Sequence, residues 1–169
     1  MKRATSLVVL MGLLVALFAS MAVADSFTGG DGNNTISGTN GDDYIAGQGG
    51  DDTLNGRLGN DRIYGGTGAD TVIGQPGNDV LNGGTGSDDI TTNDGRDEAY
   101  GADGNDTIVA VNDTEPDFVN CGPGNDDTAK IQANDYVDDT QGNQISVGVL
   151  GLSCENIVVN GKVVIGNPL

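Results

Sequence analysis

A nine-residue repeat runs without a gap from Gly29 to Val109 and constrains the fold more than any other feature of the sequence. Three consecutive units, GRLGNDRIY, GGTGADTVI and GQPGNDVLN, show the pattern: glycine first and fourth, aspartate sixth and a branched aliphatic residue eighth. All nine units have glycine fourth, and eight have aspartate sixth, where the first unit has Asn34. Such a short, strict period predicts a solenoid of stacked equivalent units.

The pattern resembles the G-G-x-G-x-D-x-U-x nonapeptide of the RTX (repeats-in-toxin) calcium-binding proteins. The resemblance covers residues 29–109 closely and 110–137 loosely, and it implies an all-β fold, a right-handed parallel β-roll with calcium bound to its turns. Each unit would supply six residues of turn and three of strand, and two units would make one coil, so that residue i stacks on residue i+18. After a two-residue insertion the repeat is expected to resume with Asp117 and Val119, Asp126 and Thr128, and Asp135 and Val137.

The eighth positions provide the expected core. Because the central side chain of a three-residue strand points inward while its neighbours point outward, alternate units build two apolar columns. One column contains Ile36, Leu54, Val72, Ile90 and Ile108, and the other contains Ile45, Ile63, Leu81 and Ala99. Columns one residue wide make a thin core for a chain of this size, so something besides apolar burial must hold the coils together.

The sixth-position aspartates are the candidates for that role. Neighbouring coils lie about 4.8 Å apart, and each step between stacked carboxylates costs roughly 1 kcal/mol in water and about 3.5 kcal/mol at an effective dielectric of 20. A cation bound between the coils would replace this repulsion between carboxylates with attraction of both carboxylates to the ion. Half a step, about 2.4 Å, falls in the calcium–oxygen range and exceeds the roughly 2.05 Å of magnesium. Zinc is disfavoured because the chain has no histidine and two cysteines.

We expect about six well-formed Ca²⁺ sites, each between a sixth-position carboxylate and the one 18 residues further on. First- and fourth-position glycines would let the turn aim its carbonyls at the ion. Thr92 and Arg96 depart from the pattern in the eighth unit, and glycine–aspartate turns that merely cap short strands are the structural alternative. The expected ligands are Asp43, Asp52, Asp61, Asp70, Asp79, Asp88, Asp97 and Asp106, together with Gly41, Gly50, Gly59, Gly68, Gly77, Gly86 and Gly104.

The two ends of the chain differ from the repeat. Residues 1–24 combine a basic start, a short apolar run and an Ala-Val-Ala end, as in a cleavable secretory signal peptide. Residues 25–137 would form the roll and residues 138–169 a β-hairpin cap, with Asn160-Gly161 as its two-residue turn. In an exported chain, the only two cysteines, Cys121 and Cys154, are expected to form a disulfide, with free thiols as the alternative.

Charge narrows the function. The chain has 25 acids and seven bases, which argues against nucleic acid or an anionic membrane as a direct partner, and the periodicity argues against the disorder that such a composition usually signals. Without histidine the usual catalytic triads are missing, so we expect no enzyme. The sequence predicts a secreted, extracellular or cell-surface protein that folds on binding calcium after export. The alternative is a calcium-dependent adhesion module for ice, a surface polysaccharide or another envelope component.

Overall fold

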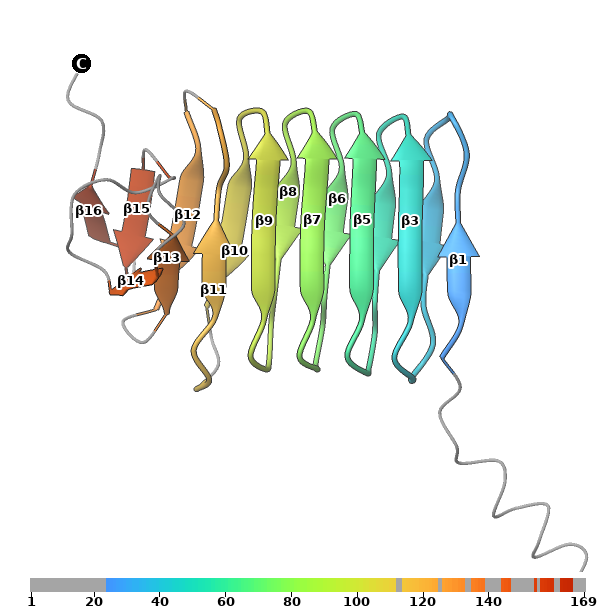
Figure 1. The fold of residues 1–169 in the computed structure, drawn as a ribbon, viewed down its shortest axis with the longest axis horizontal. Coiled ribbons are helices and arrows are strands. Elements are labelled where there is room, and N and C mark those ends of the chain that lie inside the picture. The colour runs from blue at the N-terminus through green and yellow to red at the C-terminus, as the bar shows by residue number, and fades with distance from the viewer. Residues whose placement is uncertain are drawn as a thin grey trace, which may run out of the picture.

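The computed structural model describes residues 24–111, 114–124, 126–132, 135–138, 144–146, 154, 156–159 and 162–165. In this part the chain forms an all-β parallel solenoid of about six turns (Figure 1). The expected signal peptide up to residue 23 lies outside the described residues, as does the expected Asn160-Gly161 turn. Among the described residues there is no helix with the length and apolarity of a membrane span.

The strands form two eight-stranded sheets, which stand in front of and behind one another in Figure 1, and strands β1 to β13 alternate between them. The first sheet contains β1 (Ser26–Thr28), β3 (Tyr44–Gly49), β5 (Arg62–Thr67), β7 (Val80–Thr85), β9 (Glu98–Asp103), β11 (Phe118–Asn120), β13 (Tyr136–Asp138) and β14 (Gln144–Ser146). The second contains β2 (Thr35–Ser37), β4 (Thr53–Asn55), β6 (Thr71–Ile73), β8 (Asp89–Thr91), β10 (Thr107–Ala110), β12 (Thr128–Ile131), β15 (Asn156–Val159) and β16 (Lys162–Ile165).

The strand register confirms that two nonapeptides make one coil. Thr35 pairs with Thr53 and Thr53 with Thr71, all in parallel strands, so equivalent residues 18 apart are neighbours. The turns that follow odd-numbered strands lie at the top of Figure 1 and are called the upper turns here: residues 29–34, 47–52, 65–70, 83–88 and 101–106. The turns that follow even-numbered strands are the lower turns: residues 38–43, 56–61, 74–79 and 92–97.

Strand lengths differ between the two sheets, which the expectation of uniform three-residue strands missed. The strands β3, β5, β7 and β9 each have six residues, because pairing continues into the first three positions of the upper turns, as between Gly66 and Gly84. The even-numbered strands of the regular repeats stop at the lower turns. Pro76 lies at the third position of one lower turn, where it has no N–H to donate to a ladder.

The core consists of the two expected columns of eighth-position side chains. Leu54, Val72, Ile63 and Leu81 are completely buried, whereas Ile36, in the first coil, is only partly buried against the cluster. The columns continue towards the C-terminal end through Ala110, Val119, Cys121, Ala129, Ile131, Val137, Cys154 and Ile157.

The expected register around Asp126 is wrong by one residue. Asp127 is buried and Ala129 lies in the core, while Asp126 is exposed. The pairing of Thr107 with Thr128 spans 21 residues and that of Glu98 with Phe118 spans 20, so this coil contains one more inserted residue than the sequence count allowed. Counting nine from Asp117 could not reveal that insertion, because adjacent aspartates satisfy either register.

The C-terminal segment adds an antiparallel strand to each sheet. Strand β14 pairs with β13, and β16 pairs with β15, which itself continues the parallel stack on β12. The β15–β16 pairing confirms the two strands of the expected hairpin, whereas its role as a cap stays a prediction. Cys121 and Cys154 form the predicted disulfide, with their Cα atoms 5.2 Å apart.

Candidate metal centre

The sixth-position aspartates form two ladders, one along each row of turns. In each ladder the backbone N–H of one aspartate donates to Oδ1 of the aspartate in the next coil, as from Asp52 to Asp70 and from Asp70 to Asp88, both at 2.8 Å. The lower turns repeat this contact from Asp61 to Asp79 at 2.8 Å and from Asp79 to Asp97 at 2.7 Å. The structure therefore brings together the residues that the sequence paired 18 apart.

The two carboxylate oxygens of these aspartates have different surroundings: Oδ1 accepts the N–H described above, and Oδ2 does not. In six of the eight predicted aspartates Oδ2 is buried and has no hydrogen-bond donor within the described part of the chain, although the whole residue is only 1 % exposed. A buried charged oxygen without a partner is costly enough that proteins normally pair it or bind a metal there. These six residues are called the open aspartates: Asp52, Asp61, Asp70, Asp79, Asp88 and Asp106.

First-position glycines make the space into which Oδ2 points. A Cβ built on Gly56 would lie 2.7 Å from the carbonyl oxygen of Gly74 in the next coil and closer still to Oδ2 of Asp61. Gly47 and Gly65 show the same pairing of a next-coil carbonyl with the Oδ2 of their own turn. The glycine thus leaves room for a carboxylate oxygen and a carbonyl oxygen to approach the same point, and any side chain would fill that room.

Asn34 shows what surrounds the sixth position, because it is the one regular unit with an amide there. Its Nδ2 donates to Asp52 Oδ1 at 3.0 Å, to the Gly30 carbonyl at 3.4 Å and to the Gly32 carbonyl. Three oxygens from two coils therefore converge on one nitrogen. In the coils with aspartate at the sixth position, the repeat register places a carboxylate oxygen where Asn34 has its nitrogen. That oxygen would face only other oxygens, and the cluster of oxygens would need a hydrogen-bond donor or a cation at its centre.

Other sixth-position aspartates obtain that donor from the protein. Asp43 Oδ2 accepts hydrogen bonds from Thr39 N at 2.5 Å and Thr39 Oγ1 at 3.0 Å. Asp117 Oδ2 accepts from Thr92 Oγ1 at 3.1 Å, and Asp135 Oδ2 accepts from Gln132 N at 2.6 Å. Thr92, which departs from glycine at a first position, is therefore a donor in the ladder. We call Asp43, Asp117 and Asp135 the closed aspartates.

Burial raises the pKa of five open aspartates. Loss of solvation raises the pKa of Asp79 and of Asp106 to about 7 and that of Asp88 to about 6, opposed by the N–H that each accepts and reinforced by the neighbouring ladder carboxylate. The pKa values of Asp61 and Asp70 are raised for the same reasons. A cation at these oxygens would remove the cause of the shift by compensating the buried charge.

The donor set fits a hard cation such as Ca²⁺. Within the described residues no three His, Cys, Asp or Glu side chains converge on one point, so an ion at an open aspartate must take most of its ligands from backbone carbonyls, which calcium accepts. Six of the seven predicted fourth-position glycines, all except Gly41, have left-handed φ values. At Gly68, with φ +130°, a Cβ would overlap the carbonyl oxygen of Gly50 in the neighbouring coil.

A second ladder, which the sequence interpretation missed, runs along the fifth positions in the opposite direction. Here the side-chain oxygen of one coil accepts the N–H of the next, as from Asn60 N to Asp42 Oδ1 and from Asn78 N to Asn60 Oδ1, both at 2.8 Å. The signal was present, since six of the nine fifth positions are Asn or Asp. These exposed residues hold adjacent turns in register, and the charges of Asp42 and Asp51 help to raise the pKa of Asp61 and of Asp70.

Comparison with known proteins agrees with this geometry. The profile of the RTX calcium-binding nonapeptide repeat, which spans four copies, matches residues 28–63, 55–90 and 82–110. No curated protein and no solved structure matches the chain. The matched segments overlap into one continuous stretch that contains all eight predicted aspartate ligands and both rows of regular turns. On this basis the chain belongs to the RTX calcium-binding nonapeptide repeat family.

Proposed function

We propose that this protein is a secreted calcium-binding module that binds about six ions between successive coils and folds when it binds them. The observation that supports the proposal is the set of six open aspartates, whose buried Oδ2 atoms lack a donor. Each would contribute one carboxylate oxygen to an ion, and carbonyls of its own turn and of the neighbouring coil would contribute the rest. The bound calcium would supply the positive charge that these oxygens need.

Folding on binding follows from the balance of forces in the roll. The core is two columns wide, and the stacked carboxylates of adjacent coils repel one another by roughly 1 to 3.5 kcal/mol per step. Whole domains are stable by only about 5 to 15 kcal/mol, so several uncompensated steps would unfold the metal-free chain. Because each ion would order a turn that the next coil also uses, binding would be cooperative along the solenoid.

Export fits this mechanism. Proteins with this repeat are typically secreted, and the Cys121–Cys154 disulfide is the kind of bond that persists outside the cytoplasm. A chain that is unfolded at low calcium would cross a membrane unfolded and acquire its structure in calcium-rich surroundings. We propose a binding and structural role rather than an enzymatic one, since the roll's buried carboxylates are accounted for by the ladders.

The test is circular dichroism of residues 25–169 during titration with each ion. Calcium should produce a cooperative rise in β signal with a midpoint near the range of extracellular modules, about 10⁻⁴ to 10⁻³ M. Magnesium at the same concentrations should not, because its shorter bonds do not span the half-step between coils. A protease-resistant β fold in EDTA at neutral pH, or an equal response to both ions, would contradict the proposal.

A further inference from the structure

The outer faces of the two sheets differ in chemistry. All four tyrosines of the sequence belong to strands of the first sheet, which stands in front in Figure 1. In each regular coil the residues on either side of the buried eighth position point outward, and in the second sheet none of these outward residues is aromatic. We call the outward surface of β3 to β11 in the first sheet the aromatic face. Its seventh positions pair in parallel register from coil to coil and hold Tyr44, Arg62, Val80, Glu98 and Phe118.

Two pairs of rings lie on this face. The ring centroids of Tyr44 and Tyr64 are 5.5 Å apart, and those of Tyr100 and Phe118 are 5.7 Å apart. The pairs lie on opposite sides of Asn82, because Tyr64 is one coil before it and Tyr100 one coil after it. Tyr44 is 45 % exposed and Tyr64 36 %. Grouped, exposed aromatic side chains mark an interaction surface, and the regular repeat does not require them.

The seventh positions of the aromatic face read the same from either end, apart from the sign of the charge. Val80 is central, with Arg62 one coil before it and Glu98 one coil after it. The next coil outward on each side holds a ring, Tyr44 on one side and Phe118 on the other. Turning the row end for end therefore brings a cation to an anion and a ring to a ring. Such self-complementarity is what a two-fold interface between identical chains requires, because residue i of each copy meets residue j of the other.

The two charges of this row are available to a partner. Arg62 is exposed, and its guanidinium makes no hydrogen bond or ion pair with the described residues. Glu98 is exposed as well, and its Oε2 accepts a hydrogen bond from the Tyr100 hydroxyl at 3.1 Å. Within one copy Arg62 and Glu98 are two coils apart, with Val80 between them. A second copy can supply each of them with the opposite charge that its own coil neighbours lack.

We propose that the aromatic face binds a second copy of the chain. The first sheets of the two copies pack face to face, about 10 Å apart and with their strands aligned, around a two-fold axis that runs parallel to the strands and passes over Val80. Arg62 of each copy then faces the partner's Glu98, so that two ion pairs form. Each ring pair of one copy faces the other ring pair of the partner. The proposal goes beyond calcium binding, since it gives the roll a defined partner.

Charge and size set the strength of this dimer. Each copy has a net charge of −18, which opposes association, whereas the seventh-position row of the aromatic face has one cation and one anion. Five strands about 4.8 Å apart, each six residues or roughly 20 Å long, bury roughly 500 Å² per copy, near the lower limit of specific interfaces. The dimer therefore forms at micromolar concentrations, and positive charge from bound calcium favours it.

The experiment is sedimentation velocity of residues 25–169 in calcium over a range of concentrations, where the unmodified chain should change from one copy to two. Arg62→Glu and Glu98→Arg should each weaken dimerisation at least tenfold, because each variant alone places like charges opposite one another at both contacts. An equimolar mixture of the two variants should restore the dimer, because both contacts again join opposite charges. The double variant Arg62→Glu with Glu98→Arg should dimerise like the unmodified chain.

Two control variants change the net charge equally on the outer face of the second sheet. Lys130→Glu matches Arg62→Glu, and Asp89→Arg matches Glu98→Arg, and both residues are exposed. Neither control should change dimerisation. Tyr64→Ala, which removes one ring of a ring pair, should weaken it at least tenfold without changing the net charge.

Three results would overturn the inference: a folded chain that stays monomeric up to about 1 mM, single charge variants that dimerise as well as the unmodified chain, or a mixture of those variants that stays monomeric. Equal weakening by the second-sheet controls would also overturn it. Circular dichroism of the same samples verifies that each variant is folded, and the double variant decides where a single one is not. Dimerisation of a chain that keeps its β signal in EDTA would contradict calcium-dependent folding and leave this inference standing.

Discussion

The turns that end at Asp43 and at Asp70 share their glycine pattern and their place in a ladder, yet only Asp43 finds a donor in its own turn. Thr39, at the second position, donates its N–H and its hydroxyl to Asp43 Oδ2. Gly66 has the same position before Asp70 and has no hydroxyl to offer, and Asp70 Oδ2 has no donor within the described residues. Thr39 is also not among the second-position residues with left-handed φ, whereas Gly66 has φ of 121°. The backbone conformation and the hydroxyl at the second position together distinguish the turn that supplies its own donor from the turn that lacks one.

The first coil extends this comparison. Asn34 places an amide nitrogen among three oxygens, so the protein supplies internally the donor that an open aspartate lacks. Closed turns lie towards both ends of the repeat, at Asn34 and Asp43 and again at Asp117 and Asp135, while the open aspartates lie between them. The ends of the roll can therefore keep their local structure with little calcium, and the middle depends on it.

The largest effect is expected from a side chain in the crowded middle turns. Gly68→Ala places a Cβ on the Gly50 carbonyl and on a left-handed backbone, which should destabilise the calcium-bound protein by about 2 to 4 kcal/mol. Gly32→Ala, at the same position of the first coil, meets nothing within 4 Å and should change stability little. Urea unfolding in calcium measures both, and equal losses would show that the first turn is as crowded as the middle ones.

Acid should replace calcium in the middle turns. In the folded chain the pKa values of Asp79 and Asp106 are about 7 and that of Asp88 about 6, above the roughly 3.9 of an unfolded aspartate. The metal-free fold therefore holds protons more tightly than the unfolded chain, so its stability is greatest below about pH 4 and declines as the pH rises through 6 to 7. Chelator-treated protein should therefore show more β signal in circular dichroism at pH 5 than at pH 8. A β signal of the chelated protein that rises with pH would contradict the assignment of buried, uncompensated carboxylates.

A smaller effect is expected from opening the first turn. Asn34→Asp replaces the donating amide with an oxygen among the Gly30, Gly32 and Asp52 oxygens, which should destabilise the first coil by about 1 to 3 kcal/mol when no ion is bound there. Calcium should restore the lost stability, and the variant should bind one more calcium ion than the unmodified chain. Calorimetric stoichiometry beside the unmodified chain measures this, and a variant that is equally stable with and without calcium would show that the three oxygens do not form an ion site.

The sequence predicted the coil, the 18-residue register, the core columns and the aspartate ladders, because each depends only on a strict period. It missed features that depend on single substitutions within that period. The repeat pattern assigns no role to Thr39 or to the fifth-position Asn and Asp residues, and it shows Thr92 only as a departure from glycine. The shift from Asp126 to Asp127 was hidden because two adjacent aspartates fit two registers equally, and only burial of Ala129 distinguishes them.

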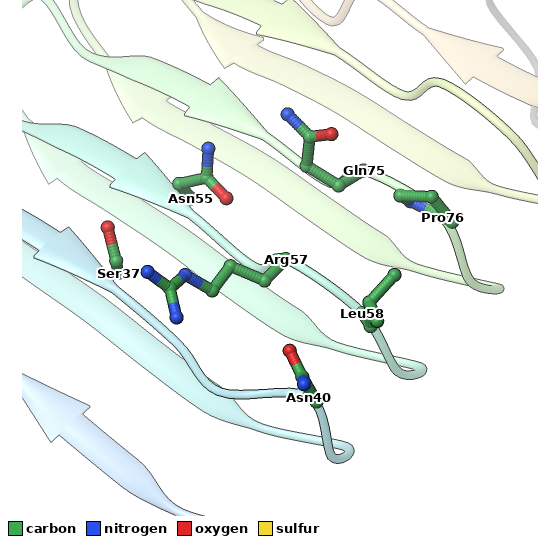
Figure 2. A pocket seen from close by; sticks show the side chains of 7 residues that line it. All are labelled: Ser37, Asn40, Asn55, Arg57, Leu58, Gln75 and Pro76. Atoms are coloured by element: carbon green, nitrogen blue, oxygen red, sulfur yellow. The ribbon is translucent and has the colours of Figure 1, made fainter.

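A shallow hollow where the second sheet meets the lower turns, lined by Ser37, Asn40, Asn55, Arg57, Leu58, Gln75 and Pro76 (Figure 2), could not be predicted for a different reason. Its residues occupy second, third and ninth positions, which vary from unit to unit, and they become neighbours only when the lower turns stack. The left-handed φ at the second position is also invisible in the sequence, because glycine occurs there in some turns and long polar residues in others. The residues at variable positions of the repeat determine this surface, and the repeat pattern does not predict them.

The comparison of open with closed aspartates is tested most directly by two charge-matched variants, Asp70→Asn and Asp43→Asn. Each removes one negative charge from a buried ladder position. Calcium stoichiometry and midpoint, measured by calorimetry on residues 25–169, should show that Asp70→Asn loses at least one ion and weakens the cooperativity of the rest, whereas Asp43→Asn keeps the stoichiometry of the unmodified chain. Equal loss of calcium in the two variants would contradict the claim that the missing donor marks the calcium sites.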